Sequence, residues 1–169
     1  MDIGAASEKA MGMSDAVWAR HTNPWSVWTR IASGPAWFLA LWSYTWIGWR
    51  AAIPIALMAA WTWINPRAFP PPKHFEAWAS KAVLGERVWL ERKEHPIPVG
   101  FSRAASISIV ISLMSLAVAA YGFWRRDFWA AFMGWHAAML SKVWFVDRMA
   151  FLWSLTSDQA GRMRAWSIS

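Results

Sequence analysis

The chain has 169 residues, of which 57% are hydrophobic and 16% are charged, and its net charge is +7. This length leaves room for one compact unit, and the absence of cysteine excludes disulfides, thiolate metal sites and cysteine catalysis. Tryptophan occupies 17 positions, a frequency typical of membrane–water interfaces, where the apolar ring and the polar N–H both find partners. We therefore attribute the positive charge to a membrane surface rather than to nucleic-acid binding.

Residues 1–33 form a polar N-terminal segment that lacks a short apolar run near its start. We therefore expect no cleavable signal peptide, and the first membrane crossing would itself direct insertion. Ser14 predicts the N-cap of a short helix over residues 16–20, and Asn23 before Pro24 predicts the start of a second one. Tryptophans in the turns that follow indicate that this second helix is short and lies in the membrane interface.

Residues 34–64 contain a single charge, Arg50. As one straight helix they would span about 46 Å at ~1.5 Å per residue, whereas a bilayer crossing needs only about 20 apolar residues. The sequence Gly48-Trp49-Arg50 offers a break in the middle. We predict a first transmembrane hairpin with two short crossings. The alternative is one tilted helix, which would give the chain three crossings in all.

Residues 65–103 form the most polar internal segment, and we expect a cytoplasmic loop lying on the membrane face. Asn65-Pro66-Arg67 is predicted to end the preceding helix, because proline disfavours helical backbone before it. Two short helices are predicted over residues 75–83 and 86–92, with Gly85 separating them.

Residues 104–154 predict a second transmembrane hairpin that turns at residues 125–127, followed by a C-terminal tail over 155–169. Small residues recur at helical spacing in its first half and predict a helix-packing face, because they let another helix approach closely. These residues are Ala105, Ser108, Ser112, Ser115 and Ala119.

The predicted fold class is therefore all-α, an integral membrane protein with two short transmembrane helical hairpins, four crossings in total, and interfacial helices. The hairpin tips carry only Arg50, Arg125 and Arg126, whereas most other Lys and Arg residues lie in the N-terminal segment, the middle loop and the C-terminal end. The positive-inside rule then predicts a multi-pass protein of the cytoplasmic (inner) membrane with both termini cytoplasmic.

His136 lies near the centre of the fourth predicted crossing. An ionisable side chain at that depth needs a partner and is a functional candidate. A neutral imidazole could ligate the central metal of a haem or chlorin, and this is the only cofactor that the sequence suggests besides lipids. The alternative, which we favour, is a hydrogen bond to a serine across the bundle, on the Ser108–Ser115 face.

A second candidate site is a cluster of polar residues at predicted helix ends, which the topology would bring to one depth at the cytoplasmic interface. It could bind an anion or a lipid headgroup, or it could consist of ion pairs and caps, which is the interpretation we favour. Lys142 would extend towards the same interface. The cluster comprises Arg20, His21, Asn23, Asn65, Arg67, Glu86, Arg87, Asp147 and Arg148.

Several unusual strings occur in a fixed order: WARHTNPWSVWTR at 18–30, NPRAFPPP at 65–72, WASKAVLGERVWL at 78–90 and WFVDRM at 144–149. With these strings the chain resembles, over about residues 14–153, a family of small bacterial and archaeal membrane proteins known only as a domain of unknown function. The resemblance implies a small multi-helix membrane fold and brings no activity, cofactor or catalytic residue.

The sequence contains no catalytic or metal-site motif, so we name no catalytic or metal-binding residue and favour a non-enzymatic role. The leading hypothesis is an accessory or scaffold subunit that packs against other transmembrane subunits or a second copy of itself. One alternative is a pigment- or haem-binding membrane protein with His136 as axial ligand. Another is a lipid-headgroup-binding protein or enzyme that works at the polar cluster. The expected partners include membrane lipids and exclude nucleic acid.

Overall fold

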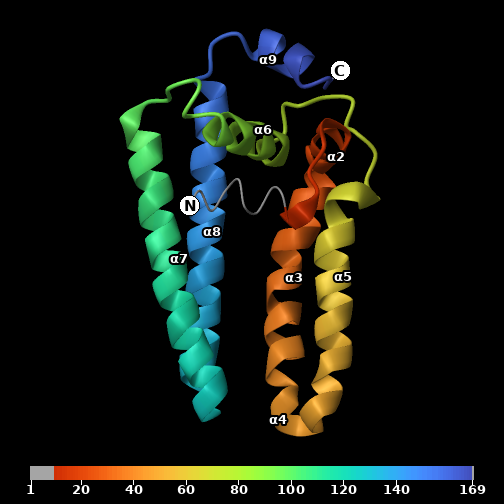
Figure 1. Ribbon diagram of the computed structural model, residues 1–169, viewed down its shortest axis with the longest axis vertical. Coiled ribbons are helices and arrows are strands. Elements are labelled where there is room, and N and C mark those ends of the chain that lie inside the picture. Colours follow the sequence, from red (N-terminus) through yellow and green to blue (C-terminus); the bar gives the residue numbers. More distant parts are fainter. Residues whose placement is uncertain (1–9, 169) are drawn as a thin grey trace.

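The structure, a computed structural model, describes residues 10–168 and is all-α over that range, with no strand in it. Two helical hairpins stand side by side, and shorter helices cover one end of the pair (Figure 1). The all-α prediction is confirmed for the described part of the chain. The short helices over residues 15–21 and 159–165 lie at this covered end, so it gathers polar segments from both halves of the sequence.

The first hairpin begins with two capped helices. The short helix α2 (Asp15–His21) starts at Ser14, whose side chain accepts a hydrogen bond from the Val17 N–H. The next helix, α3 (Pro24–Trp42), starts at Asn23 as predicted. The expected short interfacial helix is wrong, because α3 continues through Pro35 without a break and forms the first long arm of the hairpin.

The chain reverses between residues 43 and 51. A four-residue helix, α4 (Tyr44–Ile47), and a 3₁₀ turn, η1 (Gly48–Ala51), precede the returning helix α5 (Ala52–Ala68). Gly48 has φ +60°, a backbone conformation that glycine adopts without steric cost. The predicted break is thus confirmed, and the alternative of one long helix over residues 34–64 is wrong.

Pro66 does not end α5, contrary to the prediction. Proline inside a helix removes the hydrogen bond to the carbonyl four residues earlier, which here belongs to Thr62. Arg30 of α3 replaces that bond, since its Nη2 donates to the Thr62 oxygen at 2.8 Å. The helix therefore continues to Ala68, and the two arms of the hairpin are joined at this point.

The middle segment contains one helix, α6 (Trp78–Leu90), rather than the two predicted. It extends between α2 and the end of α8, at the covered end of the two hairpins (Figure 1). Gly85 does not break it. A Cβ at this position would lie 1.8 Å from the carbonyl oxygen of Met149, so glycine is needed for close helix–helix contact.

The second hairpin consists of α7 (Val99–Arg125) and α8 (Phe128–Ser154), which turn where predicted. Ala105, Ser108 and Ala119 are buried, while Ser112 and Ser115 are half-buried. A Cβ at Gly134 of α8 would lie 2.4 Å from the Ala119 nitrogen, so the small residues of α7 pack against α8 of the same chain.

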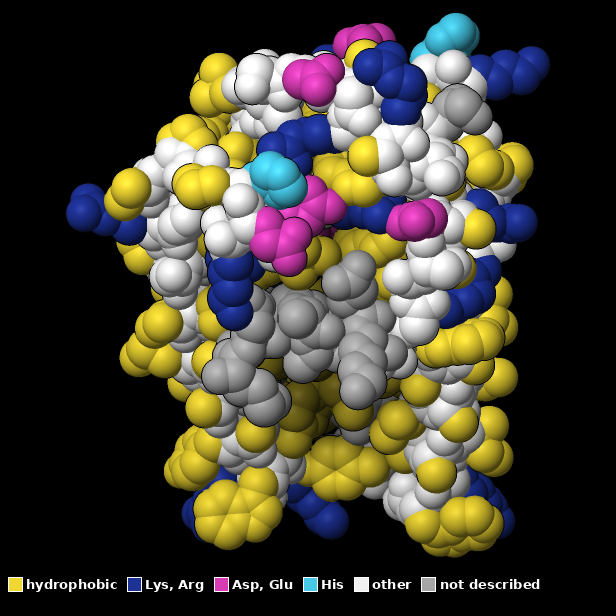
Figure 2. All heavy atoms as spheres, turned by 45° about the horizontal axis from the view of Figure 1, so that its top comes forward, with side chains coloured by type: hydrophobic (Ala, Val, Ile, Leu, Met, Phe, Trp, Pro, Cys, Tyr) yellow, Lys and Arg dark blue, Asp and Glu magenta, His cyan; other side chains and the backbone are white. Residues whose placement is uncertain are grey.

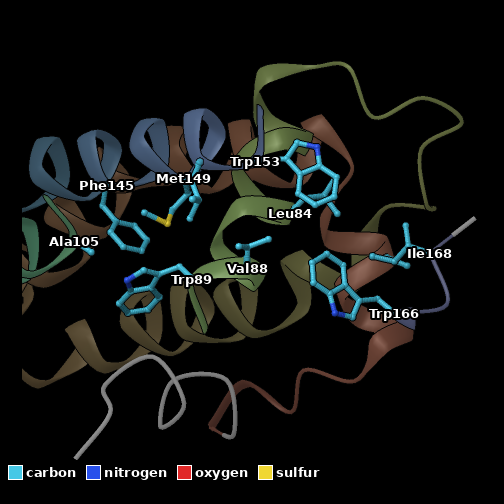
Figure 3. Packing of buried hydrophobic residues seen from close by; sticks show 11 residues of the cluster. Leu84, Val88, Trp89, Ala105, Phe145, Met149, Trp153, Trp166 and Ile168 are labelled. Carbon is cyan, nitrogen blue, oxygen red and sulfur yellow. The ribbon is translucent and has the colours of Figure 1, made fainter. Parts of the chain in front are cut away.

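The last helix, α9 (Gln159–Ala165), makes the C-terminal segment part of the core rather than a loose tail. Trp166 and Ile168 are buried against residues of α6 and α8, which Figure 3 shows converging from separate elements. The indole N–H of Trp166 donates to Glu91 at 2.7 Å, and Arg162 pairs with the same carboxylate at 3.1 Å.

An aromatic cluster joins the two hairpins further towards their tips. Phe38 and Trp42 of α3 are buried against Phe123, Phe132 and Trp135 of the second hairpin. The Tyr44 hydroxyl also donates to the Phe123 carbonyl, and the Trp135 indole donates to the Gly34 carbonyl at 2.9 Å.

The outward faces of the hairpins are apolar. Leu57, Met114 and Leu140 are each between 66% and 70% exposed. The segments Pro24–Ala68 and Val99–Arg125 are long and apolar enough to cross a membrane, and only 6% and 17% of their most apolar windows are buried. Figure 2 shows hydrophobic side chains along the hairpins and charged ones gathered at the end formed by α6 and α9, with further Lys and Arg at the tips.

Candidate functional site

Two adjoining cavities lie between the hairpins, on the α6 side of the aromatic cluster. One has a volume of about 280 Å³ and reaches α7, and the other has a volume of about 440 Å³ and reaches α5. Both are lined by Met11, His21, Arg30, Glu86 and Lys142. We call the combined space the inter-hairpin chamber.

Four ionisable side chains from four helices line this chamber. His21 comes from the end of α2, Arg30 from the second turn of α3, Glu86 from the middle of α6 and Lys142 from α8. Glu86 and Lys142 form an ion pair with an Nζ–Oε1 distance of 3.1 Å. Arg30 is anchored by its bond to the Thr62 carbonyl, so its position follows from the proline in α5.

A chain of hydrogen bonds fixes the proton position on His21. The Thr29 hydroxyl donates to the Trp25 carbonyl at 2.6 Å, so it accepts from Asn65 Nδ2 at 2.8 Å. That orientation points Asn65 Oδ1 at Ser26, whose hydroxyl donates to it at 3.0 Å. The Ser26 hydrogen lies within reach of both the Oδ1 and the backbone carbonyl of Asn65, and when it is donated there the Ser26 oxygen accepts from His21.

The His21 ring therefore carries its hydrogen on Nδ1, which lies 2.7 Å from Ser26 Oγ. In the neutral ring the other nitrogen, Nε2, is then an acceptor with a free lone pair. No described residue donates to this nitrogen, although the side chain is only 6% exposed and lines both cavities.

His21 is neutral in the folded protein. Burial, together with the positive charges of Arg30 and Lys142, lowers the pKa of His21 to about 3 from 6.5, and the nearby Glu86 only partly opposes this. Glu86 stays ionised. Burial would raise the pKa of its carboxyl group, but the charge and hydrogen bond of Lys142, with the charge of Arg30, outweigh burial and hold the pKa below its usual value.

The remaining walls of the chamber combine hydroxyl-bearing residues with apolar surfaces, and the former are Ser33, Thr62, Ser108 and Ser112. The Ser108 hydroxyl is buried on α7 and has no hydrogen-bond partner among the described residues. Apolar side chains line most of the remaining wall, among them Leu113, Phe145, Trp135 and Met139. The chamber thus offers charges at its α6 end and apolar surface towards the hairpin tips.

A model of a family of unknown function, DUF6653, matches residues 2–167. The chain belongs to this family. The predicted membership of an uncharacterised family is confirmed. Searches of curated proteins and of solved structures gave no match. The description of this family, DUF6653, names no activity.

The predicted polar cluster does not form one site in this DUF6653 protein. His21 and Glu86 line the chamber, and Asn65 orients Ser26 beside it. Asn23 caps α3 and donates to the Pro70 carbonyl, while Arg20 is exposed.

The remaining members of the cluster also have local partners. Arg67 donates to the carbonyls of Met11, Gly12 and Trp63. Arg87 pairs with Asp15 and lies against the Trp18 and Trp166 rings. Arg148 pairs with Asp147, which also accepts from the Trp78 indole at 3.1 Å.

His136 lies outside both cavities of the chamber. Its Nδ1 donates to the Phe132 carbonyl at 2.8 Å, not to a serine of α7 as expected. Its ring centroid lies 4.1 Å from that of Phe132 and 5.7 Å from that of Phe38. The ring thus packs beside two aromatic side chains, and its role as an axial ligand of a haem or chlorin stays a prediction. Among the described residues no group of three or more His, Cys, Asp or Glu could hold a metal ion.

Sequence reasoning missed Arg30 and assigned Lys142 a different role. Lys142 does extend towards the α6 end, but it ends in an ion pair with Glu86 instead of free in the interface. The available signal was one cationic residue in each of two otherwise apolar helical stretches, Trp25–Trp42 and Phe128–Val146. A charge in such a stretch needs a partner within the bundle.

Proposed function

We propose that the chain is an integral protein of the cytoplasmic membrane whose two hairpins cross the bilayer four times, with both termini and α6 on the cytoplasmic side. The apolar outer faces of the hairpins support this, because patches of this extent are unfavourable in water. The distribution of Lys and Arg supports the orientation, since the tips carry only Arg50, Arg125 and Arg126.

Labelling of introduced cysteines tests this topology, and the cysteine-free chain needs no prior substitution. Trp49→Cys lies at a hairpin tip and Glu94→Cys follows α6, and both positions are exposed. In intact cells an impermeant maleimide should label the first and not the second. Labelling of both positions from the same side would contradict paired crossings.

We propose further that the protein is a non-enzymatic binding protein for an anionic membrane amphiphile, whose headgroup occupies the inter-hairpin chamber. The observation that carries this proposal is the convergence of His21, Arg30, Glu86 and Lys142 on one cavity with apolar walls. Arg30 is half-buried and Lys142 is exposed towards the chamber, and a bound anion would accept charge-assisted hydrogen bonds from the N–H groups that their contacts with Thr62 and Glu86 leave over.

The net charge of the chamber restricts which headgroup charge a ligand can carry. Arg30 and Lys142 contribute two positive charges, Glu86 contributes one negative charge, and His21 is neutral. The chamber is therefore left with one uncompensated positive charge, which a headgroup with a single negative charge neutralises. The apolar wall beside Leu113 and Phe145 suits the start of an acyl chain.

The test is lipid binding to delipidated protein in mild detergent, followed by native mass spectrometry. Phosphatidylglycerol should bind more tightly than phosphatidylcholine. Lys142→Met should weaken phosphatidylglycerol binding about tenfold, because it removes one charge-assisted hydrogen bond. Arg164→Met, on the exposed side of α9, is the matched control and should leave binding unchanged. Equal affinity for both lipids, or no effect of Lys142→Met, would contradict a site in the chamber.

A role as accessory subunit of a larger membrane complex is a separate proposal. The small-residue face of α7, from which the sequence predicted a partner, packs against α8 of the same chain and is not available to another subunit. What supports it now is the set of exposed aromatic residues at the hairpin tips, among them Trp46, Trp49 and Trp124. Migration only as a free monomer on a native gel in mild detergent would count against it.

A further inference from the structure

The inter-hairpin chamber contains a hydrogen-bond acceptor as well as hydrogen-bond donors. The hydrogen-bonding groups of the headgroup are therefore restricted, in addition to its charge. The donors are the remaining N–H groups of Arg30 and Lys142 and the unpartnered hydroxyl of Ser108. The acceptor is Nε2 of His21, which the hydrogen-bond chain through Ser26 and Asn65 leaves with a free lone pair. A headgroup that carried only an anion would make no use of this acceptor.

We propose that the bound headgroup is a phosphodiester that also carries a hydroxyl group, with the phosphate between Arg30 and Lys142 and the hydroxyl donating to His21 Nε2. This inference rests on the proposed function, since it assumes that an anionic amphiphile occupies the chamber. It adds a specificity-determining role for His21, which contributes no charge of its own.

A hydroxyl fits this position better than an ammonium group does. Arg30 and Lys142 already face His21, and both disfavour a positive charge on its ring. A headgroup ammonium next to Nε2 would meet the same repulsion, and it would cancel the negative charge of the phosphate. Phosphatidylglycerol meets both requirements, whereas phosphatidylethanolamine meets only the need for a donor.

Ser26 and Asn65 have a positioning role in this recognition. They are fully buried and do not line either cavity, but they fix which nitrogen of His21 carries the hydrogen. If the hydrogen were on Nε2, that nitrogen would be a donor, and the chamber would lose its acceptor for the hydroxyl.

The decisive experiment compares two lipids of equal charge, one with hydroxyl groups in its headgroup and one without. Phosphatidylglycerol and phosphatidylmethanol of equal chain length carry the same phosphodiester charge, but the second has no hydroxyl. In native mass spectrometry of the delipidated wild-type protein, phosphatidylglycerol should bind about fivefold more tightly, as expected for one neutral hydrogen bond. Equal affinity would overturn this inference and leave the proposed function intact. Binding of neither lipid would overturn both.

His21→Asn then assigns the preference to Nε2. The asparagine amide can replace Nδ1 as the donor to Ser26, so the fold is retained, but it has no group in place of Nε2. The variant should bind the two lipids with equal affinity, at about the level of phosphatidylmethanol binding to the wild type. A preference retained in His21→Asn would overturn the assignment to His21.

Discussion

The two helices of each hairpin are joined to one another by a different kind of interaction in the first hairpin than in the second. In the second hairpin, α7 and α8 approach so closely that a Cβ at Gly122 would lie 2.1 Å from the Ala131 nitrogen, and a Cβ at Gly134 would also clash. In the first hairpin, α3 and α5 are joined by polar side chains. Arg30 and Trp37 of α3 bond to Thr62, and Ser26 and Thr29 of the same helix bond to Asn65.

This difference explains where the chamber lies. Small residues let helices pack without space between them, as in α7 and α8. Hydrogen bonds between longer side chains keep α3 and α5 joined while holding polar atoms in fixed directions. The first hairpin thus supplies the oriented groups, Arg30 directly and His21 through Ser26, and the second supplies a close-packed wall with Lys142 and Ser108.

The largest effect is expected from a methyl group between α7 and α8. Gly134→Ala places a Cβ 2.4 Å from the Ala119 nitrogen and 2.7 Å from the Ser115 oxygen, so the helices must separate. We expect a loss of about 3 kcal/mol in the free energy of unfolding, at the upper end for overpacking. Circular dichroism during thermal unfolding in detergent measures it. Gly100→Ala, with nothing within 4 Å, is the control and should be neutral or slightly stabilising. Equal stability of the two variants would contradict close packing in this hairpin.

Much of the fold could be predicted from the sequence, because helix caps and breaks are local. Ser14 and Asn23 act as caps, and Gly48 lies in the turn of the first hairpin. The failures have a common cause, which is that a distant residue changed the local preference. Pro66 stays within α5 because Arg30 replaces its missing hydrogen bond, and Gly85 stays within α6 because Met149 lies against it.

A smaller loss is expected from the polar contact of the first hairpin. Asn65→Ala removes the acceptor for Ser26 and the donor to Thr29, both within a fully buried side chain. Thr29 would lose this donor, and Ser26 would keep only the backbone carbonyl of residue 65 at 3.2 Å, so the change should cost about 2 kcal/mol in the free energy of unfolding. The exposed Ser106→Ala, which loses only a bond within α7, should cost less than about 0.5 kcal/mol. Similar losses in both variants would indicate that packing alone, not hydrogen bonding, joins α3 to α5.

The candidate site was less predictable than the fold. His21 and Glu86 were named from their places at helix ends, but they were grouped with residues such as Arg67 and Arg87 that have other partners. Which polar residues share a cavity depends on how the two hairpins dock. That docking is set by aromatic contacts such as Phe38 with Phe132, and no spacing in the sequence encodes it.

The effect that is smallest near neutral pH, and that tests the link between the hairpins, is a pH dependence from His21. The unfolded chain takes up a proton at this side chain as the pH falls below about 6.5, whereas the folded protein does not until about pH 3. Stability should therefore fall with falling pH across this window, by at most about 1.4 kcal/mol per pH unit. Between pH 7 and 5 the loss of stability belongs to His21 rather than Glu86, because the Glu86 carboxyl has a lowered pKa and contributes only below about 4.5.

Thermal unfolding in detergent at pH 7, 6 and 5 should show a weaker pH dependence for His21→Asn than for the wild type, while the exposed His95→Asn should match the wild type. An unchanged slope in His21→Asn would mean that this ring is not held neutral between the hairpins.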